Sequence, residues 1–165
     1  MRTLFLIFTV SLVISQSLAQ TKKDEVLKIT YLSSSHGKIT EDQDPQVLFV
    51  SSDLVKGSSA DKLSGEAEFP YEEFFIDWNA NPVEYIKTAY FSENSISKTI
   101  DTGFIDRYDY NLTEETKEIL GYTCYKTVTT VNSNTIELWH TNELPYKASP
   151  VALGQNVGVV LEYVR

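Results

Sequence analysis

Two-residue alternation of apolar and polar side chains runs through most of this chain and limits what it can fold into. Val, Ile, Thr and Tyr recur in short runs separated by turn residues, a pattern typical of strands. We therefore predict a mainly β fold, a curved antiparallel sheet of half-barrel or carrier-like form, with one short helix. The predicted strands are 26–31, 46–52, 85–91, 96–101, 104–112, 119–131, 135–141 and 157–164.

One stretch departs from this alternation and predicts the short helix. Residues 69–78 read FPYEEFFIDW, with Pro70 at a first-turn position. Glu72 and Glu73 then lie near the positive end of the helix dipole, and apolar residues follow at spacings of three and four. The segment 51–65, rich in Ser, Gly, Lys and Asp, is predicted to be an exposed loop.

The first residues have the three parts of a secretory signal peptide. Arg2 supplies the positive charge, residues 4–14 form an apolar run, and small residues precede a cleavage site at Ala19. The run is shorter than the ~20 residues that a membrane-spanning helix needs. We expect removal of residues 1–19, a secreted or periplasmic location, and a single β-rich domain over 20–165 without a transmembrane span.

Charge argues against two classes of partner. The chain carries 14 basic and 23 acidic residues, and loss of Arg2 with the leader leaves a formal charge of −10. Such a surface repels phosphate backbones and anionic lipid headgroups. We therefore expect no nucleic-acid partner, while the identity of any other partner stays open.

The most strongly patterned region is a predicted antiparallel hairpin. Its arms are 119–131 and 135–141, and the Asn-Ser-Asn turn at 132–134 suits left-handed backbone angles. Alternation on the first arm places Leu120 and Cys124 together on the more apolar face.

Cys124 is the only cysteine in the chain, so an internal disulfide is excluded. A buried thiol packs as a small hydrophobe with a raised pKa, which makes it a poor nucleophile. A thiol protease needs a histidine base, and only His36 and His140 are present. A zinc site needs closely spaced Cys and His ligands, and one cysteine with two distant histidines gives no such spacing. We favour packing; an intermolecular disulfide and a pairing with His140 across the hairpin are the alternatives.

Other catalytic patterns are missing from the sequence. It has no phosphate-binding glycine loop, no serine elbow and no metal-ligand spacing. The adjacent acids Glu72-Glu73 and Glu114-Glu115 are typical of solvated surface rather than of a glycosidase pair. We predict a non-enzymatic protein without a cofactor or a metal.

An ordered set of residues occupies the last third of the chain. It reads Gly-Tyr-Thr-Cys-Tyr-Lys at 121–126, Trp-His-Thr-Asn-Glu-Leu-Pro at 139–145, and Gly-Val-Val-Leu-Glu at 158–162. This order resembles the GLPGLI family of secreted proteins from Bacteroidota, although residues 155–157 depart from the motif that names the family. The resemblance implies a mainly β protein with no established activity. It also implies packing and turn roles for Gly121, Tyr122, Cys124, Trp139, Pro145 and Gly158.

Two functional hypotheses follow. In the first, the concave face of the sheet binds a hydrophobic ligand or an envelope protein, and an ordinary filled core is the competing interpretation. The candidate ligand-binding residues are Tyr122, Trp139, Leu161 and Tyr163. In the second, the chain is an accessory module at the front of a longer secreted enzyme that acts on glycans or peptides.

Overall fold

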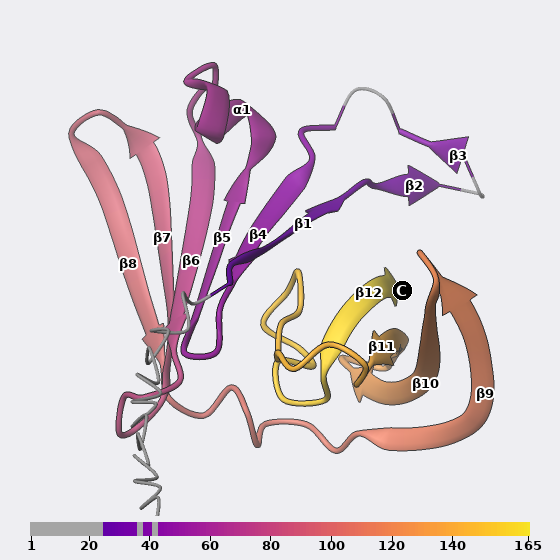
Figure 1. The fold of residues 1–165 in the computed structure, drawn as a ribbon. Helices are drawn as coiled ribbons and strands as arrows, with labels where there is room; N and C mark the ends of the chain where they lie inside the picture. The colour runs from indigo at the N-terminus through magenta and orange to yellow at the C-terminus, as the bar shows by residue number, and fades with distance from the viewer. Residues whose placement is uncertain (1–24, 36–37, 41–42) are drawn as a thin grey trace, which may run out of the picture.

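The computed structural model describes residues 25–35, 38–40 and 43–165. Within them the fold consists of two open antiparallel sheets, a two-stranded ribbon and one short helix (Figure 1). The predicted leader lies outside the described residues, and no helix among those described is long and apolar enough to cross a membrane.

The first sheet has six strands in the order β1-β4-β5-β6-β7-β8. All of its neighbours are antiparallel, and the ribbon of β2 and β3 extends from β1 and β4. The bounds are β1 Leu27–Tyr31, β2 Ser34–Ser35, β3 Lys38–Ile39, β4 Gln46–Val50, β5 Leu54–Ser59, β6 Tyr71–Asp77, β7 Glu84–Ser92 and β8 Ser95–Asp101.

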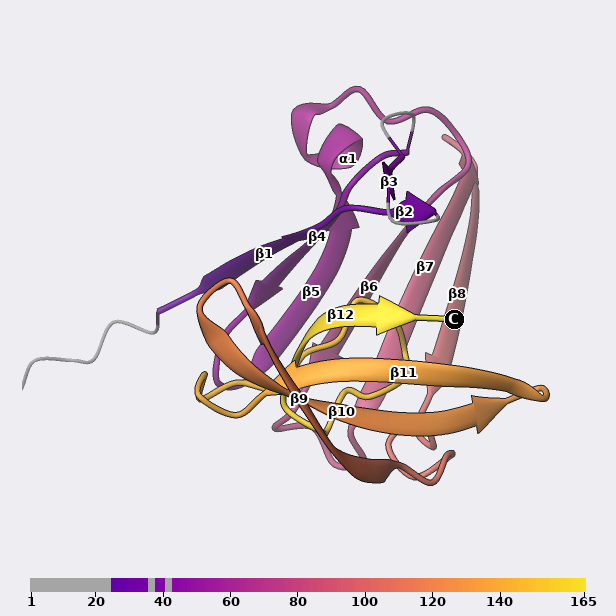
Figure 2. The same ribbon diagram turned by 90° about the vertical axis from the view of Figure 1, so that its right-hand side faces the viewer.

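The second sheet has four strands in the order β12-β11-β10-β9. Its bounds are β9 Asn111–Ile119, β10 Tyr122–Val131, β11 Asn134–Thr141 and β12 Val159–Val164. Figure 2 shows that these strands cross those of the first sheet instead of running beside them. The segment between β11 and β12 returns to the first sheet, so residues far apart in sequence meet there.

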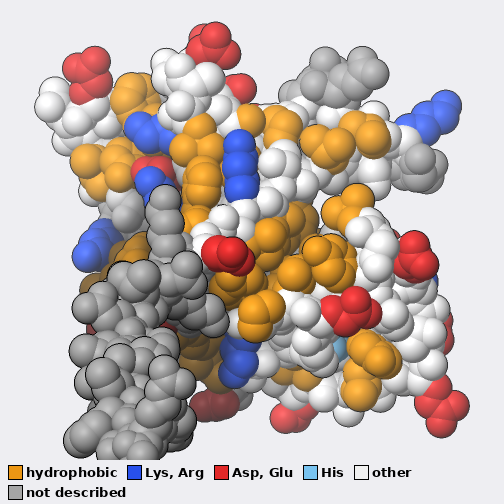
Figure 3. All heavy atoms as spheres, in the orientation of Figure 1, with side chains coloured by type: hydrophobic (Ala, Val, Ile, Leu, Met, Phe, Trp, Pro, Cys, Tyr) orange, Lys and Arg blue, Asp and Glu red, His pale blue; other side chains and the backbone are white. Residues whose placement is uncertain are grey.

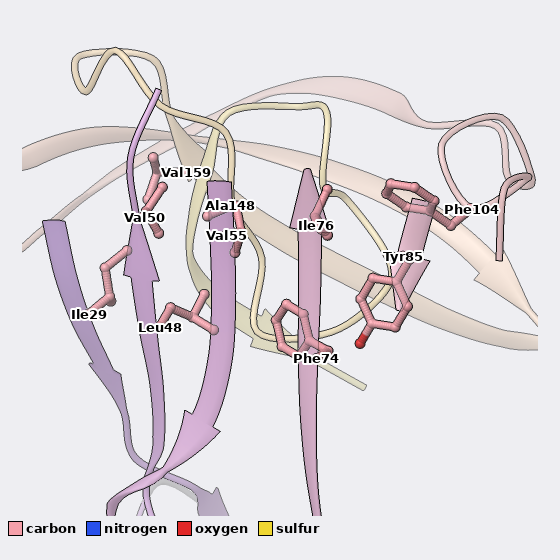
Figure 4. Close-up of a cluster of buried hydrophobic side chains, with 10 residues drawn as sticks. All are labelled: Ile29, Leu48, Val50, Val55, Phe74, Ile76, Tyr85, Phe104, Ala148 and Val159. Carbon is pink, nitrogen blue, oxygen red and sulfur yellow. The ribbon is translucent and has the colours of Figure 1, made fainter. Parts of the chain in front are cut away.

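The main core fills the space where the two sheets meet. Figure 4 shows side chains from the first sheet directed toward Ala148 and Val159 of the C-terminal segment. A smaller cluster of Ile136, Leu138 and Val160 lies on the second sheet. The buried members of the main core are Ile29, Leu48, Val50, Val55, Phe74, Ile76, Tyr85, Phe104, Ala148 and Val159.

The prediction of a mainly β, antiparallel chain with one short helix is confirmed, with the strands divided between two sheets. The hairpin is also confirmed: β10 and β11 are antiparallel, and Val131 pairs with Asn134 across the turn. Positive φ values at Asn132 and Ser133 provide the left-handed backbone that a two-residue hairpin turn requires.

The predicted helix over 69–78 is wrong, because this segment contains strand β6. Phe74 and Ile76 alternate toward the core, and Ile76 is paired with Val55 of β5 and with Tyr85 of β7. Burial between two neighbouring strands outweighs the weak helical preference of the acidic first turn.

The predicted loop over 51–65 is also wrong, because it contains β5 and the helix α1, Ala60–Ser64. The Ser59 hydroxyl caps the helix by accepting a hydrogen bond from the backbone N–H of Lys62. Gly65, at a φ of 84°, ends it in the left-handed conformation that favours glycine. Serine and glycine therefore mark helix ends here, not an irregular loop.

Two further strand assignments need correction. Residues 104–108 form turns and bends, residues 109–110 are irregular, and Phe104 is buried against Tyr85. The strand predicted over 119–131 is interrupted by a tight turn, where Leu120 has a positive φ and is 83% exposed. Leu120 therefore does not share a buried face with Cys124.

Candidate functional site

A cavity of about 420 Å³ lies between the ends of the first sheet and the segment that joins β11 to β12. The first sheet contributes Ser52, from the β4–β5 turn, and Trp78, just after β6. The remaining lining residues are Asn142, Leu144, Pro145, Tyr146, Lys147, Asn156 and Gly158. In the space-filling view of Figure 3, hydrophobic side chains gather in the region between β1 and the C-terminal segment, whereas acidic side chains are scattered.

The wall of the cavity is held by a buried glutamine. Gln155 is 1% exposed; its side-chain oxygen accepts from the Ser149 backbone N–H at 3.1 Å. Its side-chain nitrogen donates to the backbone oxygens of Ser149 and Val151, at 2.8 and 2.6 Å. Ala148 also bonds to the backbone of Gly158 and Val160. These bonds fix the segment 148–158 against the second sheet, so the cavity wall has a defined backbone conformation.

Trp78 is the largest side chain that lines the cavity. Its backbone N–H donates to Asp53, and its ring packs at a tilt against Phe104, with centroids 6.3 Å apart. Its Nε1 is buried and has no hydrogen-bond partner among the described residues. The Nζ atom of Lys147 lies 6.0 Å from the ring centroid, at the outer limit of a cation–π contact. The indole therefore packs against the main core and also borders the cavity.

Gly158 lines the back of the cavity, and His140 lies behind Gly158, outside the lining. Gly158 has a φ of 133°, and a Cβ added there would lie 2.6 Å from Asn142 Oδ1 and 3.3 Å from His140 Nδ1. His140 Nε2 pairs with the Thr127 hydroxyl at 2.9 Å, whereas Nδ1 is buried and without a partner in the described chain. Burial lowers the pKa of His140 below its ordinary value of 6.5.

Trp139, a candidate from the sequence, lies in a different environment. It is 8% exposed, and Lys117 Nζ lies 4.1 Å from its ring centroid, with Lys126 Nζ at 5.8 Å. Lys126 forms ion pairs with Glu115 and Glu137, which raise its pKa. We call Trp139, Lys117 and Lys126 with these glutamates the lysine-covered face.

The other predicted ligand-binding residues are not gathered around Trp139. Tyr163 packs against the smaller cluster of Leu138 and its neighbours, whereas Leu161 packs against the main core. Leu161 has no paired residue in β11, because the register between β11 and β12 shifts between Trp139 and His140. Tyr122 is half-buried at the start of β10. A shared ligand-binding role for these residues stays a prediction.

The residues singled out for packing and turns have varied positions. Gly121 has a φ of 83° in the β9–β10 turn, whereas Pro145 and Gly158 line the cavity. Cys124 is completely buried, and burial raises the pKa of its thiol. His140 pairs with Tyr125 in the register and bonds to Thr127, so it does not lie opposite Cys124.

A metal cluster is not found in the part of the chain that the structure describes. No group of three or more His, Cys, Asp or Glu side chains lies close enough there to bind a metal ion. A hollow of about 150 Å³ on the outer face of the first sheet is bordered by Phe75 and Tyr90. It is smaller than the ~300 Å³ of a usual small-ligand site.

Sequence reasoning missed most of the cavity. Trp78 was assigned to the end of a helix, and Ser52 to the overlap between the predicted strand 46–52 and the predicted loop 51–65. One signal was available, because Phe74, Ile76 and Trp78 continue the two-residue alternation that identifies an inward face. The residues from Asn142 to Gly158 gave no such signal, since they belong to an irregular segment whose path depends on Gln155.

The two crossed sheets and the cavity beside their junction define a small, mainly β domain. A family model described as the N-glycanase peptide, N-terminal domain, of PNGase F-II matches residues 29–165. The chain belongs to this family.

Solved structures agree with this assignment. Two structures of PNGF-II, in C2 and P21 space groups, match 83% of this chain at 39% sequence identity, with TM-scores of 0.75 and 0.77. The chain spans about a quarter of their length, 24% and 25% respectively. A comparison with curated proteins finds no match.

The predicted membership of the GLPGLI family is therefore wrong, and so is the GLPGLI-type binding protein inferred from it. In this fold Gly121 lies in a tight turn with a positive φ, and Trp139 is largely buried. At 155–157, where the sequence departs from that motif, Gln155 is bonded to the backbone of Ser149 and Val151.

Proposed function

We propose that the chain is a non-catalytic accessory domain of a secreted protein that acts on N-linked glycans, and that it contacts the glycoprotein substrate. The observation that carries the proposal is the family match over residues 29–165, to the N-terminal domain of an N-glycanase. The PNGF-II chains of known structure are about four times as long as the part that this chain resembles. Their remaining length leaves room for chemistry elsewhere in the protein.

The chemistry of the cavity supports a binding role. Hydrolysis needs positioned acid and base groups, usually carboxylates, histidine or cysteine. None of the residues that line the cavity is Asp, Glu, His or Cys. Cys124 is fully buried and its pKa is raised, which disfavours the thiolate that a nucleophile needs. The predicted leader over 1–19 supports a location outside the cytoplasm, where glycoproteins are met.

The proposal is tested with the purified chain and one N-glycoprotein in two forms, intact and with its glycans removed enzymatically. Biolayer interferometry on immobilised protein measures binding, and mass spectrometry of the glycoprotein measures glycan release. We expect tighter binding to the intact form and no release. Equal binding to both forms refutes the substrate-contacting role, and release by the chain alone refutes the non-catalytic one.

A further inference from the structure

The lining of the cavity combines two kinds of surface that rarely occur together. Trp78 and Tyr146 supply aromatic faces, and Leu144 with Pro145 adds apolar wall. Polar atoms come from two amides, a hydroxyl and an ammonium group. The polar contributors are Ser52, Asn142, Asn156 and Lys147.

These residues argue against two ligand classes, acyl chains and polyanions. An acyl chain would leave the amides of Asn142 and Asn156 unpaired, which costs free energy on desolvation. A polyanion needs several cationic contacts, whereas Lys147 is the only cationic residue in the lining of a chain with excess negative charge.

A sugar ring matches both kinds of surface. Its C–H face is apolar and packs on an aromatic ring, while its hydroxyls both donate and accept hydrogen bonds. An Asn side chain offers two donors and an acceptor, so each amide can pair with a hydroxyl in either sense. The volume of about 420 Å³ also falls within the ~300–1,000 Å³ range of small-ligand sites.

We propose that the cavity between the two sheets is a binding site for a neutral sugar residue, with Trp78 as the stacking platform and Asn142 and Asn156 as its hydrogen-bonding partners. The inference rests on the proposed function in so far as that sugar belongs to a glycan chain. Trp78 is suited to this role because its ring has no close cation over it, unlike Trp139 under Lys117.

The test uses two neutral disaccharides, N,N′-diacetylchitobiose and cellobiose, titrated at millimolar concentrations into the chain and followed by heteronuclear NMR shifts. We expect at least one to bind, and Trp78→Ala to weaken that binding at least tenfold. Trp139→Phe is the matched control, because its ring lies outside the cavity, and it should leave binding unchanged.

A second pair of variants keeps the proposal testable if Trp78→Ala fails to fold. Asn142 and Asn156 are exposed, so the double substitution Asn142→Ala with Asn156→Ala should fold and should weaken binding at least tenfold. Asn94→Ala, in the exposed β7–β8 turn, removes an amide elsewhere and should have no effect. Binding of neither disaccharide, or binding that survives the double substitution, overturns the proposal.

The same variants separate this inference from the proposed function. If the chain prefers the intact glycoprotein and the cavity substitutions leave that preference unchanged, the sugar site is refuted and the accessory role stands. If the disaccharides bind in a cavity-dependent way while intact and deglycosylated protein bind equally, the sugar site stands and the role on N-glycans is refuted.

Discussion

The two tryptophans of this chain differ in what covers them. Trp139 is 8% exposed, and the ammonium of Lys117 lies 4.1 Å from its ring centroid. Trp78 is half-buried beside a cavity, with Lys147 Nζ at 6.0 Å. Trp139 lies in the more conspicuous sequence pattern, yet its ring is already engaged. The comparison teaches that the space around an aromatic ring, rather than the motif that contains it, distinguishes a ligand-binding ring from a packed one.

Charge reinforces the difference. On the lysine-covered face, Lys126 is paired with two glutamates at 3.1 and 2.9 Å, and Lys117 is paired with Glu162 at 2.6 Å. The glutamates neutralise these ammonium groups, and the ion pairs hold the two lysine side chains over Trp139. In the cavity, Lys147 has no carboxylate beside it in the lining. Its ammonium is therefore available to an oxygen of a bound ligand.

The largest expected effect is on stability, from Trp139→Ala. Removal of a buried tryptophan leaves a cavity and should lower the free energy of unfolding by about 3–5 kcal/mol. Trp78→Ala should cost roughly half as much, because one side of that ring already borders open space. Urea denaturation of the three proteins measures both losses. Equal losses would show that Trp78 is an ordinary core residue and would remove the basis of the comparison.

Gly158→Ala should have the next largest effect. Its φ of 133° is strained for any residue with a side chain, and the added Cβ would lie 2.7 Å from the backbone oxygen of Thr141. We expect a loss of about 1–3 kcal/mol in the free energy of unfolding, together with weaker disaccharide binding. Gly121→Ala is the control: a Cβ there meets nothing within 4 Å, so it should cost less and leave binding intact. Unchanged disaccharide binding by Gly158→Ala would contradict a role of Gly158 in the wall of the sugar-binding cavity.

The sequence predicted the strands better than the site. Alternation identified most of both sheets because burial of one face imposes a period of two. It failed at 69–78, where acidic residues and Pro70 gave a helical pattern to a strand that is stabilised by both of its neighbours. It also failed at Leu120, because a turn conformation does not depend on hydrophobicity.

The cavity was less predictable for a different physical reason. Its lining comes from the ends of the first sheet and from the segment between β11 and β12, whose path is fixed by hydrogen bonds of Gln155. A single buried glutamine produces no periodic pattern in the sequence. A polar residue in an irregular stretch looks the same in the sequence as one in a solvent-exposed loop. Trp78 was the exception, since its spacing from Phe74 and Ile76 already placed it on the inward face.

A substitution of Cys124 is expected to have a smaller effect on the free energy of unfolding. Because the thiol is completely buried, Cys124→Ala removes little apolar surface and should cost about 1 kcal/mol. Burial raises the pKa of the thiol, so a maleimide should label the folded chain slowly and the denatured chain quickly. Fast labelling of the native protein at neutral pH, with loss of an activity in the alanine variant, would show that the thiol is reactive instead of packed.

The smallest expected effect concerns pH and the back of the cavity. Burial lowers the pKa of His140 in the folded state, so the unfolded chain binds its proton more readily than the native one. The contribution of His140 to the free energy of unfolding should therefore be constant above its ordinary pKa, fall as the pH drops below that value, and level off below the depressed native pKa. His140→Gln retains a partner for the Thr127 hydroxyl but does not titrate, so its unfolding free energy should change less between pH 7 and about 5.5.

Trp139→Phe is the control and should keep the full pH dependence. Trp139 lies on the lysine-covered face, where the charge of Lys126 is stabilised by Glu137 and Glu115. Identical pH profiles for the parent chain and His140→Gln would show that His140 is not a source of the pH dependence.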